Sequence, residues 1–100
     1  MTNYEGKYLV SLNSLALNER DHIIYLTQVS TVIPFRYINK ELLNKAPMGR
    51  VFAYNYLSGE LSLIKDKLYF PNGIVYDEQT ESIIFAELNR YRLSRINLSG

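Results

Sequence analysis

The feature that most constrains the fold is a repeated unit: an asparagine, an apolar strand, a polar turn and a second apolar strand. The first unit begins at Asn13 and its second strand covers 23–27, whereas the second begins at Asn72 and its second strand covers 83–87. The two asparagines are 59 residues apart. A repeat of this kind is typical of proteins in which one supersecondary unit stacks on the next, because a single unit cannot bury its own apolar faces.

The remaining segments also alternate between apolar strands and polar turns. Residues 8–17 are apolar on both faces, which indicates a strand covered on both sides. A tight turn at 57–60 separates two further strands. Gly73 gives the chain a place to turn or bulge behind Asn72. The pattern predicts an all-β chain with strands at 8–17, 22–27, 50–56, 61–65, 68–70, 74–76, 82–87 and 92–98.

Residues 29–48 interrupt this rhythm. Pro34 breaks any ladder there, and 39–45 carries a capping asparagine and is followed by Pro47, which predicts one or two turns of helix. Insertions of this length are more often functional than not. Two roles stay open for the apolar side chains of this one: a lid over a site, or packing on a neighbouring unit.

Composition excludes several classes of protein. The net charge is +1, so we expect no nucleic acid partner and interpret the arginines of 90–95 as a solvated strand face. The absence of cysteine excludes disulfides and thiolate chemistry. The sequence also has no apolar run long enough for a membrane span and no signal peptide at its start.

The second unit resembles a known family. Its residues 68–75 (LYFPNGIV), 84–87 (IFAE) and 92–95 (RLSR) are similar to the conserved region of strictosidine synthase-like proteins, and to the animal members in particular. Matches at 5–13, 24–27 and 49–54 follow in the family's order with similar gaps, so the resemblance covers nearly the whole chain.

This resemblance implies a six-bladed β-propeller related to the gluconolactonase and paraoxonase groups. The chain would supply about two consecutive four-stranded blades: a first blade at 7–65 with the insertion 29–48, and most of a second at 69–100. The implied activity is that of an enzyme on a small organic substrate, by arylesterase-like ester or lactone hydrolysis or by condensation of an amine with an aldehyde. The remaining blades would be its partners, and an upstream segment would route or anchor it in the endomembrane system.

The resemblance also implies a calcium site in the central channel, with Asn13 and Asn72 as ligands. Calcium accepts neutral amide oxygens alongside carboxylates. The other interpretation is that Asn72 and Gly73 only form a turn. Ser14 and Gln28 stand where the family has acids, so we expect weak calcium binding. The further ligands of the family lie beyond these 100 residues, which leaves the site incomplete.

Glu87 matches a family glutamate at the end of a blade's second strand. It is a candidate general acid or base if desolvated. Its other interpretation is a structural carboxylate bonded by backbone amides, Arg90 or Arg92. His22, the only histidine, follows a polar turn and is expected in solvent. Residues 97–99 form a glycosylation sequon, which matters only in the secretory pathway.

Three functions therefore stay open. The first is part of a propeller enzyme. The second is a binding or scaffold propeller that has lost its active site, which the neutral Ser14 and Gln28 favour. The third is a β protein assembled around an axis from several copies. Two blades alone leave strand edges unpaired, and closure of a ring removes such edges.

Overall fold

A computed structural model describes residues 3–5, 7–8, 12–29, 49–69, 71–87 and 92–98. Within these ranges the chain forms strands and turns and no helix, so the expected all-β class is confirmed there. The expected helix at 39–45 lies outside them. The strands are β1 (Asn3–Tyr4), β2 (Lys7–Tyr8), β3 (Leu12–Asn18), β4 (Ile23–Gln28), β5 (Gly49–Asn55), β6 (Leu61–Leu68), β7 (Pro71–Asp77), β8 (Ser82–Glu87) and β9 (Arg92–Asn97).

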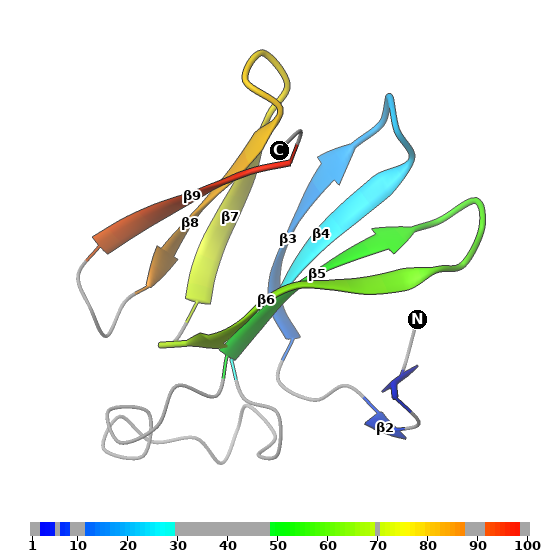
Figure 1. Ribbon diagram of the computed structural model, residues 1–100, viewed down its shortest axis with the longest axis horizontal. Coiled ribbons are helices and arrows are strands. Elements are labelled where there is room, and N and C mark those ends of the chain that lie inside the picture. The colour runs from blue at the N-terminus through cyan, green and yellow to red at the C-terminus, as the bar shows by residue number, and fades with distance from the viewer. Residues whose placement is uncertain are drawn as a thin grey trace.

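Seven of these strands form two antiparallel sheets, while β1 and β2 pair separately. The first sheet has the order β3-β4-β5-β6 and the second the order β7-β8-β9. The two sheets stand beside each other with β3 next to β7 (Figure 1). The chain leaves the first sheet at β6, on the edge far from β3, and returns to place β7 beside β3.

The sequence repeat is a repeat of strand register. Leu15 pairs with Leu26 in the first sheet, and Ile74 pairs with Phe85 in the second, each residue 59 positions after its counterpart. The other pairs of β3 with β4 recur in the same way between β7 and β8, except at the bulge, where Thr27 pairs with Ser14 but Ala86 pairs with Asn72. The two hairpins therefore share one register outside the bulge.

The turns that close the hairpins repeat as well. His22 and Glu81 both have positive φ, 61° and 49°. Their amides donate to carbonyls three residues earlier, and their own carbonyls accept the amides of Tyr56 and Leu98, which follow the third strand of each sheet. His22 lies edge-on to Tyr56, with ring centroids 5.6 Å apart. His22 is half-buried. The sequence pattern predicts a histidine in solvent, and the contact with Tyr56 accounts for the difference.

The hydrophobic core lies between the two sheets. Its buried side chains are Ala16, Tyr25, Val51, Leu68, Ile74, Ile83 and Phe85. Full burial of an aliphatic or aromatic side chain of this size contributes about 1.5–3 kcal/mol, so this layer is the main contact that holds the sheets together.

Equivalent residues show that the sheets pack front to back. We define the front face of each sheet as the one carrying Leu15 or its equivalent Ile74, and the back face as the one carrying Ala16 or Val75. In the core, the front face of the second sheet meets the back face of the first. Leu15 on the front face of the first sheet is 62% exposed and Val75 on the back face of the second is 56% exposed, so each outer face carries exposed apolar side chains. The front face of the first sheet is partly covered, because Leu26 and Phe52 there are buried and the Tyr4 ring packs against Phe52.

The crossing from β6 to β7 is tightly packed. The sequence pattern placed the end of this strand at Lys65, but β6 continues to Leu68, with Lys67 at a φ of 56° taking up the irregular register. Gly49 pairs with Leu68, and a Cβ there would overlap the Pro71 ring and lie 2.9 Å from the Leu68 carbonyl oxygen. Only glycine fits at this point.

The substitution Gly49→Ala is therefore expected to destabilise the fold by about 1–3 kcal/mol, because the Pro71 ring and the Leu68 backbone cannot move aside without strain. Gly73→Ala is the comparison: nothing lies within 4 Å of its added methyl, so only its φ of 53° is costly, by about 1–2 kcal/mol. Denaturant unfolding measures both. A Gly49→Ala protein as stable as the unsubstituted one would contradict the packing described.

Candidate functional site

The two asparagines that begin the repeats meet at the junction of the sheets. Asn13 Nδ2 donates to Asn72 Oδ1 across 2.7 Å, and both side chains are partly buried. They come from neighbouring strands, β3 and β7, at equivalent positions. Two side chains far apart in sequence are thereby brought into direct contact at one end of the sheet pair.

A β-bulge places each asparagine. In β3 the residues Asn13 and Ser14 lie opposite one residue of β4, and in β7 Asn72 and Gly73 do the same opposite β8. Gly73 has a φ of 53°, a conformation that glycine adopts without strain, and its amide donates to Asn72 Oδ1 at 2.8 Å. The bulge expected at Gly73 is thus confirmed. Bulges re-aim side chains and are common beside functional sites.

Ser14 joins the two bulges, a role that its sequence position did not reveal. Its Oγ accepts the Ile74 amide at 3.4 Å, and its own amide donates to Thr27 Oγ1 at 3.1 Å. These contacts link β7 to β3 and β3 to β4. No sequence signal points to these contacts, because a serine beside an asparagine is common in any turn.

The side-chain oxygen of Asn72 is already hydrogen-bonded within the protein. Asn72 Oδ1 accepts two hydrogen bonds, from Asn13 and from Gly73. Calcium takes six to eight oxygen ligands, and the described residues contain no cluster of three or more histidine, cysteine or acidic side chains. The asparagine pair therefore contributes at most part of a cation site.

Glu87 lies at the end of β8, next to Pro71 on one side and Arg92 on the other. It is 1% exposed. Its Oε1 accepts Arg92 Nη2 at 3.1 Å and Ser94 Oγ at 3.3 Å. Its Oε2 accepts Arg92 Nη2 at 3.3 Å and the Tyr69 amide at 3.2 Å. The carboxylate is therefore buried, ion-paired and bonded by a backbone amide, as its structural interpretation describes.

The first sheet holds a neutral counterpart of this ion pair. Gln28 stands at the position of Glu87, because each is the last residue of the second strand of its sheet. Arg50 corresponds to Arg92, because each is the register partner of that residue on the third strand. Arg50 Nε donates to Gln28 Oε1 at 2.8 Å, and Gln28 is fully buried. The guanidinium also lies 4.9 Å from the centroid of the Phe52 ring.

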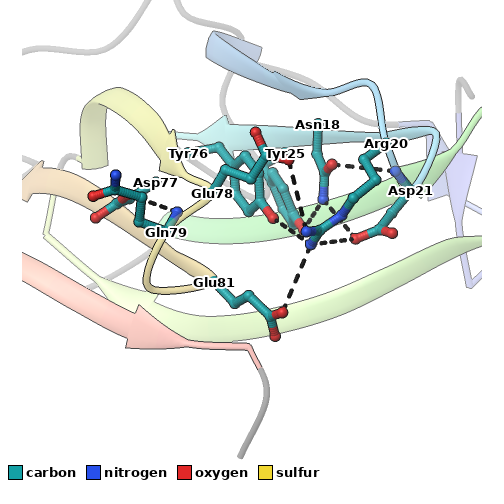
Figure 2. Close-up of polar contacts among 9 residues, drawn as sticks. All are labelled: Asn18, Arg20, Asp21, Tyr25, Tyr76, Asp77, Glu78, Gln79 and Glu81. Carbon is teal, nitrogen blue, oxygen red and sulfur yellow. Dashed lines mark hydrogen bonds and ion pairs between the residues drawn. The ribbon is translucent and has the colours of Figure 1, made fainter.

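A second polar cluster lies at the opposite end of the strands, where the two hairpin turns face each other (Figure 2). Arg20, from the turn of the first sheet, reaches three groups of the second. Its guanidinium donates to the Tyr76 hydroxyl at 3.2 Å and pairs with Glu78 and Glu81, each at 3.7 Å. A hollow of about 210 Å³ lies here, lined by Arg20, Asp21, Ile23, Tyr25, Tyr76, Glu81 and Leu98.

Two aspartates at this end have pKa values lowered by hydrogen bonds. The Asn18 amide and then Arg20 lower the pKa of Asp21, and the Thr80 hydroxyl lowers the pKa of Asp77. Burial acts the other way on Tyr25, whose ring stacks on Tyr76 with centroids 5.6 Å apart, and raises its pKa. This cluster fixes the turns of the two sheets relative to each other, at the end away from the asparagines.

Because folding lowers these two pKa values, the aspartates stabilise the fold at neutral pH and lose this contribution as the pH falls. We expect the free energy of unfolding to drop between about pH 5 and pH 2, and Asp21→Asn and Asp77→Asn each to flatten that drop. Unfolding by denaturant across this range measures it. Asp66→Asn, at an exposed position of β6, is the matched control. An acid response unchanged by all three substitutions would show that the hydrogen bonds have no such effect.

Comparison with known proteins gives the family. The family model described as strictosidine synthase matches residues 13–100. The chain belongs to the strictosidine synthase family, and the resemblance stated from the sequence is confirmed.

Individual relatives are distant in sequence but match along the whole chain. Mouse adipocyte plasma membrane-associated protein is 27% identical over 99% of this chain and 24% of its own length. The zebrafish protein of the same name is 28% identical over 95% of this chain and 23% of its own. Strictosidine synthase-like 10 of Arabidopsis thaliana is 26% identical over 100% of this chain and 27% of its own. The chain thus spans about a quarter of these relatives.

The described residues contain no helix long and apolar enough to cross a membrane. The mouse and zebrafish relatives are named for an association with the plasma membrane.

Proposed function

We propose that the chain forms two consecutive blades of a six-bladed β-propeller. The front-to-back packing supports this, since a contact between unlike faces can be repeated and closes into a ring when the rotation per unit allows. The exposed apolar side chains Leu15 and Val75 lie on the two outer faces that the preceding and following blades would cover. The length of the relatives supports it too, because the chain spans 24% of the mouse relative.

The full-length protein, in this proposal, is an enzyme acting on a small organic substrate. Its reaction is ester or lactone hydrolysis, or condensation of an amine with an aldehyde. The observation that carries the proposal is the contact of Asn13 with Asn72, because it joins polar side chains of β3 and β7, which are the inner strands of their blades in this proposal. Family membership supports the same class of chemistry. The animal relatives' names support a membrane-associated location.

These two amides supply part of a calcium site. A half-turn of the Asn13 amide exchanges its nitrogen and oxygen, so that oxygens of both asparagines face one point. Asn13 and Asn72 would then hold the cation through these oxygens instead of bonding each other, and a bound cation would polarise a carbonyl oxygen of the substrate. The remaining ligands come from other blades. Ser14 and Gln28 contribute no negative charge, so the affinity is lower than with carboxylates at those positions.

In the full-length protein, Asn72→Ala is expected to weaken calcium binding at least tenfold, because it removes one ligand, whereas Ser14→Asp strengthens it about tenfold by adding a charge. Isothermal titration calorimetry with calcium measures both. Asn97→Ala, at an exposed position on β9, is the matched control and leaves the affinity unchanged. Equal affinities in all four proteins would remove the asparagine pair from any calcium site.

A binding or scaffold propeller is the second candidate function. The neutral Ser14 and Gln28 favour it, and so does Asn72 Oδ1, which the protein's own donors already occupy. Assays of the full-length protein with an aryl ester, a lactone and an arylethylamine with an aldehyde separate the two candidates. Turnover that Asn72→Ala lowers and Asn97→Ala does not supports the enzyme. Binding of these compounds without turnover supports the scaffold.

A further inference from the structure

The position of Asn72 depends on the short connection between the sheets. Strand β6 ends at Leu68 and β7 begins at Pro71, so few residues separate the last pair of one sheet from the first pair of the next. The Tyr69 amide in this connection donates to Glu87 Oε2 at 3.2 Å. Glu87 is also the register partner of Pro71, the residue immediately before Asn72. The Glu87 carboxylate therefore holds the chain before the crossing, and the Glu87 backbone is the register partner of the first residue of β7 after it.

The surroundings of Glu87 fit an anchor better than an acid or base. Both carboxylate oxygens already accept two hydrogen bonds, from Arg92, Ser94 and the Tyr69 amide. The side chain is 2% exposed, whereas the Arg92 side chain that covers it is 58% exposed. A general acid or base has to come within hydrogen-bond reach of the reacting group, and here the protein's own donors fill those positions.

The repeat supplies an internal comparison. At the same position of the first sheet, Gln28 accepts a hydrogen bond from Arg50 and is equally buried. A neutral amide thus does at this position what the carboxylate does in the second sheet. The shared property of the two positions is a buried hydrogen-bond acceptor held by an arginine of the next strand.

We propose that Glu87, held by Arg92, is a positioning residue that sets Asn72 against Asn13. The assignment rests on the proposed function insofar as Asn72 belongs to the functional site. It gives Glu87 no contact with substrate. Its effect passes through the Tyr69 amide and Pro71 to the bulge at Gly73, where the amides of Gly73 and Ile74 donate to Asn72 and Ser14.

Hydrogen exchange in the full-length protein tests this directly, with the Gly73 and Ile74 amides as reporters and the Leu98 amide, at the opposite end, as the reference. Glu87→Ala and Arg92→Ala are expected to speed exchange at the two reporters about tenfold, the effect of losing a hydrogen bond to a charged group. Arg95→Ala is the matched control, because Arg95 lies on the same strand but bonds Thr80 and Ser82 near the turn. It leaves the reporters unchanged.

Glu87→Gln separates positioning from catalysis. As at Gln28, the amide keeps an acceptor in place, so exchange at the reporters rises less than about threefold, and the pH profile of any turnover keeps its shape. Unchanged exchange in Glu87→Ala overturns the proposal. So does a loss of activity of about 100-fold or more in Glu87→Gln, with one limb of the pH profile gone and exchange unaltered.

Two complications leave the test decisive. If Glu87→Ala unfolds the protein, exchange at Leu98 rises too. The exchange rates of the Gly73 and Ile74 amides in Arg92→Ala, Arg95→Ala and Glu87→Gln then decide whether Glu87 positions Asn72. If the unsubstituted protein turns over none of the compounds, the proposed function fails. The exchange rates still show whether Glu87 positions Asn72.

Discussion

The packing of one sheet's front face on the other's back face is the interaction on which the rest of the structure depends. Ile74 and Phe85 of the second sheet are buried against Ala16 and Tyr25 of the first. This contact places β3 beside β7, with the equivalent residues Asn13 and Asn72 joined by a hydrogen bond. It also leaves each outer face apolar, with Leu15 on one side and Val75 on the other.

The polar contacts at both ends of the strands follow from this alignment. At one end the two bulges bring Asn13 to Asn72 and Ser14 to the Ile74 amide. At the other, Arg20 spans the turns to Glu81. The Arg20 pairs are exposed, and exposed ion pairs contribute about 1 kcal/mol or less. The apolar layer therefore sets the relative position of the two sheets, and the polar contacts at both ends depend on that position.

Sequence reasoning found the features that repeat and missed those that depend on the packing. The equivalence of Asn13 and Asn72 is visible because the same pattern of strand and turn follows each residue. The sequence pattern predicts that Glu87 could be a structural carboxylate. It does not predict the bond to the Tyr69 amide, because that bond joins residues 18 positions apart across the connection between the sheets. The end of β6 was placed at Lys65, because the irregular register around Lys67 leaves no alternation to follow.

The two sheets are successive copies of one repeating unit, and the outer face of each copy requires a neighbour. Sedimentation velocity of the isolated 100-residue chain over a range of micromolar concentrations tests it most directly. The account predicts self-association that increases with concentration and that weakens when Leu15→Glu or Leu93→Glu places a charge on an outer face. A chain that remains a monomer throughout this range and unfolds in one sharp two-state transition would contradict it.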